Sequence, residues 1–214
     1  MDLLGQIKEN GIVAIIRNAS PTNILPIVRS LRAGGVKTVE ITVETPKVLT
    51  LIEKVIDEMG NELIVGAGTV LDPETARAAI MAGAKFIFSP TVNVETIKLT
   101  KRYGVISIPG ALTPTEILTA YEHGADVIKV FPANVFGPGY LKDIHGPMPH
   151  VPLMPTGGLN LGNIADYIKA GAVAVGLGNS LVNTKMLVSE SDFENLRERA
   201  EKYVQEVKKA RTLK

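Results

Sequence analysis

The stretch Asp126-Val127-Ile128-Lys129-Val130-Phe131-Pro132-Ala133-Asn134 decides how the rest of the chain is interpreted. It follows Gly124 and opens with a short apolar run of the kind that forms a buried β-strand. Strand side chains alternate between two faces, so Ile128 and Val130 share one face and Lys129 lies on the other. A lysine in such a run either pairs, reaches solvent, or loses its proton and becomes a nucleophile able to form a Schiff base.

The same unit, a glycine followed by a short β-branched run, recurs along the whole chain. Glycine is favoured just past the end of a helix, because it adopts the left-handed conformation without a Cβ penalty. Between the glycines lie helical patterns, which is the spacing of repeated strand–helix units. The glycines stand 24, 25, 23, 21, 20 and 47 residues apart, the last interval being two units: Gly11, Gly35, Gly60, Gly83, Gly104, Gly124 and Gly171.

The pattern predicts eight strands, with helices between them that begin at capping residues or at prolines. The expected strands are Ile12–Ile16, Lys37–Val43, Glu62–Ala67, Lys85–Phe88, Val105–Ile108, Asp126–Val130, Pro152–Pro155 and Val173–Gly176. The expected helix starts are Ser20-Pro21, Thr45-Pro46, Asp72-Pro73, Asn93, Thr113-Pro114, and Asn160 or Asn163. A last helix is expected from about Ser191 to Lys209, and an extra N-terminal helix over residues 1–10.

Eight such units predict an α/β protein, a (β/α)8 TIM barrel formed as a single domain by residues 1–214. A doubly wound open sheet is the alternative, and the even spacing and the missing dinucleotide fingerprint disfavour it. In a barrel, functional residues gather at the C-terminal ends of the strands and in the loops that follow them.

Composition excludes several classes of function. A net charge of +1 gives no electrostatic footprint for nucleic acid or a membrane surface, and 5% aromatics without tryptophan argue against a base-stacking platform. The chain has no cysteine, which excludes a disulfide scaffold and fits a reducing cytoplasm. We expect no signal peptide and no membrane span. The three histidines lack ligand spacing, so we expect neither a metal nor another cofactor.

The second expected strand carries a carboxylate on its inner face. Val39, Ile41 and Val43 would pack against helices, while Glu40 would point into the barrel together with two threonines. A desolvated carboxylate there is a candidate general base. The alternative is a buried ion pair, with Lys129 itself as a possible partner.

Further polar groups and glycines end the other strands. Arg17 follows the first strand and suits a carboxylate or phosphate, or else closes a surface ion pair. Thr69 and Pro90 follow the third and fourth strands. Glycine-rich turns that feed helix N-termini after the last two strands predict a phosphate site, with plain tight turns as the alternative. These turns contain Thr156, Gly157 and Gly158 in the first and Gly178, Asn179 and Ser180 in the second.

Taken together, these motifs resemble the 2-keto-3-deoxy-6-phosphogluconate (KDPG) aldolase and 4-hydroxy-2-oxoglutarate (KHG) aldolase family. The resemblance runs from about Gly5 to Val182. The motifs that carry it, in family order, are Ile15-Ile16-Arg17, Val39-Glu40-Ile41-Thr42, Gly66-Ala67-Gly68-Thr69-Val70, Phe88-Ser89-Pro90, Ile108-Pro109-Gly110, Thr113-Pro114-Thr115-Glu116, Ile128-Lys129-Val130-Phe131-Pro132-Ala133 and Pro155-Thr156-Gly157-Gly158.

The resemblance implies a class I aldolase that assembles as a homotrimer of (β/α)8 barrels and acts on a small 2-keto acid. It would cleave KDPG to pyruvate and glyceraldehyde 3-phosphate, or 4-hydroxy-2-oxoglutarate to pyruvate and glyoxylate. Lys129 matches the Schiff-base lysine and Glu40 the residue that moves protons. The implied substrate contacts are Thr69 and the Pro90 backbone for pyruvate, Thr156 for substrate hydroxyls, Gly157, Gly158 and the Gly178–Asn179 turn for phosphate, and Arg17 on the wall.

Two positions depart from the family pattern. Glu44 stands where many members carry an arginine for a substrate carboxylate, and Asn179 stands where a serine is common, with Ser180 one place later. Both departures concern substrate preference and not the imine chemistry. Two other functions stay open: another phosphate-binding barrel enzyme, such as a sugar-phosphate isomerase or epimerase, and a barrel reused as a non-catalytic or engineered scaffold.

Overall fold

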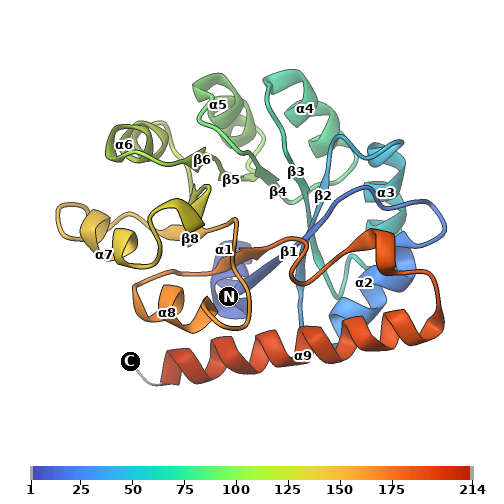
Figure 1. The fold of residues 1–214 in the computed structure, drawn as a ribbon. Coiled ribbons are helices and arrows are strands. Elements are labelled where there is room, and N and C mark those ends of the chain that lie inside the picture. Colours follow the sequence, from blue (N-terminus) through green and yellow to red (C-terminus); the bar gives the residue numbers. More distant parts are fainter. Residues whose placement is uncertain (1, 213–214) are drawn as a thin grey trace.

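The computed structural model describes residues 2–212, with parallel strands at the centre and helices around them (Figure 1). One sheet has the strand order β5-β4-β3-β2-β1-β9, and a smaller sheet has the order β6-β7-β8. The α/β class expected from the sequence is therefore confirmed. The strands are β1 (Ile12–Ile16), β2 (Thr38–Thr42), β3 (Ile64–Gly68), β4 (Phe86–Phe88), β5 (Ile106–Ile108), β6 (Gly110–Ala111), β7 (Ile128–Val130), β8 (Leu153–Pro155) and β9 (Val175–Leu177).

The division into two sheets differs from the eight-stranded ladder that the spacing predicts. The fifth expected strand continues past Ile108, but Pro109 interrupts it between β5 and β6. Proline has no backbone N–H and cannot donate to a ladder. Neighbouring strands follow chain order and β1 lies between β2 and β9, so the reversal of a doubly wound sheet is absent from residues 2–212.

Most of the helices flank the strands on the outside, while the first helix lies at one end of the strands (Figure 1). They are α1 (Leu3–Asn10), α2 (Ile24–Ala33), α3 (Val48–Met59), α4 (Pro73–Met81), α5 (Val94–Arg102), α6 (Pro114–Glu122), α7 (Gly139–His145), α8 (Ile164–Lys169), α9 (Glu190–Thr212) and the 3-10 helices η1 (Ala133–Val135) and η2 (Thr184–Met186). Within residues 2–212, none of them combines the length and the apolar character that a membrane span requires.

Three of the expected helix starts are confirmed by capping hydrogen bonds. The side chains of Asp72, Asn93 and Thr113 each accept a hydrogen bond from the backbone N–H three residues later. Thr113 and Glu116 form a full capping box. Of the two asparagines considered for α8, Asn163 is the residue that precedes it.

Two expected helix starts are wrong by two to three residues, since Asn23 and Lys47 precede the helices instead of Ser20 and Thr45. Residues 21–23 form a turn before α2, because Ser20 and Asn23 exchange hydrogen bonds of 2.7 Å and 3.2 Å. The start expected at Thr45-Pro46 gives way to Val48, since the Thr45 hydroxyl already accepts from the Asn18 N–H at 3.1 Å. At Ser20 the capping side chain serves a local turn, and at Thr45 it serves a backbone N–H 27 residues away, so neither caps the helix.

Two layers of apolar side chains hold the fold together. The larger lies between strands and helices, and the smaller fills the space inside the strands. Helix α1 closes that inner space from one end, because Ile7 is fully buried there and Leu3 and Leu4 pack beside it. The sequence predicts a helix at these residues but not its position. The packing of its apolar side chains explains why α1 lies beneath the strands.

The last helix is hydrogen-bonded to the end of the first helix, which links the two ends of the described chain. Helix α9 packs along α2 and α8 and runs along one side of the molecule (Figure 1). Its Arg211 donates hydrogen bonds of 2.6–2.8 Å to the backbone carbonyls of Lys8, Glu9 and Val173. The bonds to Lys8 and Glu9 satisfy carbonyls at the end of α1 that have no partner within that helix.

Candidate active site

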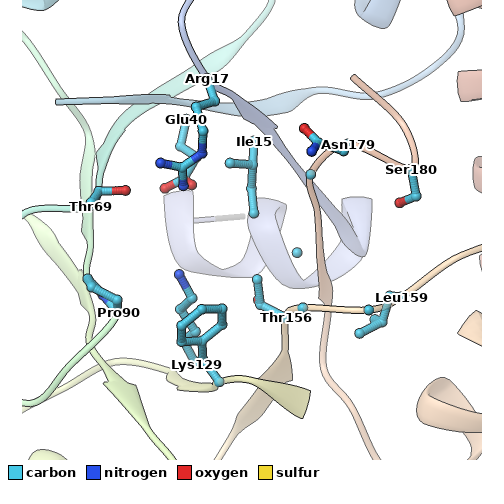
Figure 2. Close-up of a pocket in the computed structure, with 15 residues that line it drawn as sticks. Ile15, Arg17, Glu40, Thr69, Pro90, Lys129, Thr156, Leu159, Asn179 and Ser180 are labelled. Atoms are coloured by element: carbon cyan, nitrogen blue, oxygen red, sulfur yellow. The ribbon is translucent and has the colours of Figure 1, made fainter. Parts of the chain in front are cut away.

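A cavity of about 400 Å³ opens at the C-terminal ends of the strands. Side chains from strands far apart in the sequence converge on it (Figure 2). Its wall includes every residue that the sequence analysis placed in the site: Arg17, Glu40, Thr69, Pro90, Lys129, Thr156, Gly157, Gly158, Gly178, Asn179 and Ser180. Four further lining residues were not anticipated: Ile15, Phe131, Leu159 and Gly176.

The alternation of strand side chains places the amine and the acid in this cavity. On β7, Ile128 and Val130 pack in the outer core while Lys129 projects inward with 6% of its surface exposed. On β2, Val39 and Ile41 pack outward and Glu40 projects inward with 1% exposed. Lys129 and Glu40 therefore point toward one another from opposite sides of the same space (Figure 2).

Burial shifts the protonation equilibria of both groups toward their neutral forms. Desolvation raises the pKa of Glu40 from 4.5 to about 7, although the nearby charges of Lys129 and Arg17 act to lower it. Desolvation also lowers the pKa of Lys129 from 10.5 to about 8, opposed by Glu40 and assisted by Arg17. A neutral amine is therefore accessible near physiological pH, which a nucleophilic lysine requires.

The buried ion pair considered for Glu40 and Lys129 does not form within residues 2–212. Glu40 Oε2 is buried and lacks a hydrogen-bond partner there. A buried carboxylate oxygen without a partner is costly unless a water or ligand supplies one. The space between acid and amine can thus hold reacting atoms.

Two glycines of β3, Gly66 and Gly68, make room for this arrangement, a role that was not predicted from the sequence. A Cβ on Gly68 would stand only 2.0 Å from Glu40 Oε2, and a Cβ on Gly66 would stand 2.4 Å from the ring of Phe86. A side chain at either glycine would project into the interior, so its absence leaves volume there. In the sequence, the two-residue spacing of these glycines on one face of the strand could have indicated this role.

The profile of the family described as KDPG and KHG aldolase matches residues 4–198. The chain belongs to this family. A 2-dehydro-3-deoxy-phosphogluconate aldolase of Pseudomonas aeruginosa is 38% identical over 187 residues, which cover 87% of this chain and 84% of the relative. A 2-dehydro-3-deoxy-6-phosphogalactonate aldolase of Escherichia coli is 35% identical, covering 79% and 83%.

A solved KDPG aldolase structure from Legionella pneumophila contains pyruvate captured as a covalent carbinolamine intermediate. It aligns with a TM-score of 0.86 at 28% identity and covers 94% of this chain and 97% of its own. Membership of the KDPG and KHG aldolase family makes the chain an aldolase and hence a lyase.

Glu44, which departs from the family pattern expected from the sequence, lies outside the cavity wall. Its carboxylate forms an ion pair with Arg17, whose side chain is 48% exposed. Arg17 therefore lines the cavity and also closes an ion pair, while its binding of a substrate carboxylate or phosphate stays a prediction. Its backbone carbonyl accepts a 2.7 Å hydrogen bond from the Thr184 hydroxyl, which ties the end of β1 to η2.

The glycine-rich turns reach the cavity, but the expected helices do not follow them directly. Helix α8 begins only at Ile164, and the turn after β9 leads to the short 3-10 helix η2. Gly157 and Gly158 both have positive φ, at 96° and 76°, which a residue with a Cβ adopts only with strain. The expectation that helix N-termini directly follow these turns is therefore wrong. The backbone N–H groups of the glycines are the remaining candidates for binding phosphate.

No group of three or more His, Cys, Asp or Glu side chains that could hold a metal ion occurs in residues 2–212.

Proposed function

We propose that the chain is a class I aldolase that cleaves KDPG to pyruvate and glyceraldehyde 3-phosphate through a Schiff base on Lys129. 4-Hydroxy-2-oxoglutarate, which would give pyruvate and glyoxylate, is the second substrate of the proposal. The observation that carries it is the approach of Lys129 and Glu40 across one cavity, with the pKa values of both shifted toward neutrality by burial. Family membership supports the reaction class.

The proposed reaction begins with the neutral amine of Lys129. Its Nζ adds to the C2 carbonyl of the 2-keto acid, and loss of water from the carbinolamine gives a cationic iminium. Glu40 supplies and removes protons in this step. The unpartnered Glu40 Oε2 then takes the proton of the C4 hydroxyl, directly or through a water.

Bond cleavage follows from the electron demand of the iminium. The C3–C4 electron pair moves toward the iminium nitrogen, so an aldehyde leaves and an enamine of pyruvate stays on Lys129. Glu40 returns its proton at C3, and water hydrolyses the resulting imine to release pyruvate and the free amine. The reaction consumes no oxidant or reductant, because the water lost in forming the imine is taken up again when the imine is hydrolysed.

Opposite sides of the cavity are assigned to the two ends of the substrate. Thr69 and Pro90 lie on one side of Lys129, while Thr156, Asn179 and Ser180 lie on the other (Figure 2). We assign the first side to the pyruvate portion and the second to hydroxyls and phosphate. Thr156 Oγ1 is buried without a hydrogen-bond partner in the described chain, which supports a substrate hydroxyl at this position.

We propose further that both sheets close into a single (β/α)8 barrel domain. The parallel bridge between Thr156 and Gly176 and the 3.0 Å hydrogen bond from the Val173 N–H to the Leu153 carbonyl support this closure. Assembly as a homotrimer stays a prediction from the family resemblance, and a cytoplasmic location stays a prediction from the lack of cysteine. Sedimentation equilibrium would test the trimer.

Imine trapping tests the proposed function. Pyruvate and borohydride should add the mass of a reduced pyruvate adduct to Lys129 in the parent chain and to none of the lysines in Lys129→Ala. Pyruvate release coupled to lactate dehydrogenase should be lost in the same variant. KDPG and its 4-epimer, the 2-dehydro-3-deoxy-6-phosphogalactonate of the E. coli relative's name, would be assayed side by side. Turnover of a sugar phosphate without a trappable imine would instead identify an isomerase or epimerase.

A further inference from the structure

The amine of Lys129 lies against two aromatic rings. Its Nζ is 4.1 Å from the centroid of the Phe88 ring and 4.7 Å from that of Phe131. Both distances are well inside the roughly 6 Å range over which a cation is attracted by the negative face of a ring. Bulk solvent screens this attraction only weakly, because Lys129 is only 6% exposed.

The two rings differ in what else they touch. Phe131 lines the cavity, so it would also contact substrate. Phe88 is fully buried and is absent from the cavity wall, so its ring would contact Lys129 and not the substrate. Phe86, two residues earlier on the same inner face of β4, meets the Phe88 ring edge-on at 6.4 Å and 84°.

Two charged groups among the described residues face the amine from the surrounding elements: Glu40 on β2 and Arg17 at the end of β1. Arg17 repels positive charge on Nζ and is itself engaged by Glu44. Glu40 attracts positive charge only while it is ionised, and it changes protonation during the proposed reaction. The Phe88 ring is a source of attraction that does not titrate.

We propose that Phe88 is a positioning residue for Lys129, holding Nζ against its ring face and favouring the cationic forms of that nitrogen over the neutral amine. This inference rests on the proposed Schiff-base function, because the cationic forms are the resting ammonium and the iminium intermediate. Both forms place positive charge at the nitrogen beside the same ring.

The pH dependence of imine formation distinguishes this role from plain packing. At a pH well below the pKa of Lys129, an ammonium ion becomes an iminium ion, and the ring stabilises both sides equally. At a pH well above it, a neutral amine becomes an iminium ion and takes up a proton, so the ring stabilises only the product. Loss of the ring should therefore weaken imine formation at high pH and leave it nearly unchanged at low pH.

The test compares the parent chain, Phe88→Leu and a chain with 3,4,5-trifluorophenylalanine at position 88, which keeps the ring but weakens its negative face. Phe86→Leu is the matched control, because no cation lies over the Phe86 ring within residues 2–212. The pKa of Lys129 is read from its rate of acetylation by dilute acetic anhydride between pH 6 and 10, with peptide mass spectrometry. Borohydride trapping with pyruvate is measured at pH 6 and at pH 9.5.

We expect the pKa of Lys129 to fall by about half a unit to one and a half units in Phe88→Leu, and by a smaller amount in the fluorinated chain. Imine trapped at limiting pyruvate should drop about 3- to 30-fold at pH 9.5, the same shift expressed as an equilibrium constant. At pH 6 it should stay within about twofold of the parent, and Phe86→Leu should leave the pKa of Lys129 unchanged.

An unchanged pKa of Lys129 in both chains altered at position 88, or an equal loss of imine at both pH values, would overturn the proposal. The fluorinated chain keeps the test valid if Phe88→Leu does not fold. Failure of the parent chain to trap pyruvate would refute the proposed function instead. The acetylation series would still decide whether Phe88 stabilises the ammonium form.

Discussion

The Gly68→Ala variant should inactivate the enzyme by moving the carboxylate of Glu40. Gly68 has an ordinary φ, so an alanine is acceptable to the backbone and only its volume matters. The added Cβ would lie 2.0 Å from Glu40 Oε2, 2.3 Å from Cδ and 2.6 Å from Oε1. To restore an ordinary contact of 3.4 Å, Oε2 must retreat by about 1.4 Å. A displacement of about 1 Å at a reacting group costs roughly a hundredfold in rate.

The rate loss should far exceed the loss of folding. The carboxylate is the flexible end of a side chain, so we expect the free energy of unfolding to fall by only about 1 kcal/mol, at the low end for overpacking. Pyruvate release coupled to lactate dehydrogenase measures kcat, and urea unfolding measures stability. Gly139→Ala is the matched control, because a Cβ there has no neighbour within 4 Å and the residue begins α7.

A double-mutant cycle shows whether the loss of activity in Gly68→Ala is caused by the displacement of Glu40. In a Glu40→Ala background, Gly68→Ala should cost no further activity, since the displaced group is already missing. The reasoning is refuted if Gly68→Ala retains kcat within about threefold of the parent. It is also refuted if Gly68→Ala lowers kcat as much without Glu40 as with it.

Three further variants test the electrostatics and the closure of the fold. Burial raises the pKa of Glu40 from 4.5 to about 7, so the stability contributed by its protonated form is present below pH 4.5 and lost as pH rises through 7. Glu40→Gln should then raise the free energy of unfolding at pH 8 by at most about 3 kcal/mol and change it little at pH 4.5. Calorimetry at both pH values measures this, and an equal gain at the two would contradict it. Glu44→Gln releases the guanidinium of Arg17 from its ion pair. KM for a phosphorylated substrate should then fall by about two- to fivefold at low salt, the range expected for a half-exposed ion pair. A KM that does not depend on salt would contradict this. Arg211→Ala removes three hydrogen bonds to carbonyls and should cost about 2 kcal/mol in urea unfolding with kcat unchanged, whereas the exposed Lys209→Ala should cost almost nothing.

Local rules were sufficient for the parts of the fold that depend on neighbours in the chain. The glycine period and the β-branched runs located the strands, because turn geometry and period-two alternation are properties of a few consecutive residues. The same alternation put Lys129 and Glu40 on inner faces, and the structure bears this out. Capping side chains predicted three helix starts for the same reason.

The failures occurred where a side chain had two possible partners. Thr45 was assigned to a helix start, but its hydroxyl accepts from the Asn18 N–H, which lies 27 residues away along the chain. The effect of Pro109 on the sheet also depends on its neighbours, because a missing N–H matters only where a ladder would need it. The pairing of Glu44 with Arg17 joins the ends of two strands, and no pattern within either strand specifies it.

By itself, the sequence determined which side chains face inward and which chemistry they carry. The tertiary structure alone decided how those side chains share space. Parallel pairing sets Glu40 beside Gly66 and Thr42 beside Gly68, so the carboxylate of one strand occupies the volume that a glycine of the next leaves empty. Likewise, the ring of Phe88 meets the amine of Lys129 only because β4 and β7 face the same interior. Alternation is encoded within each strand, whereas register and the distance between facing strands arise only when all of them pack together.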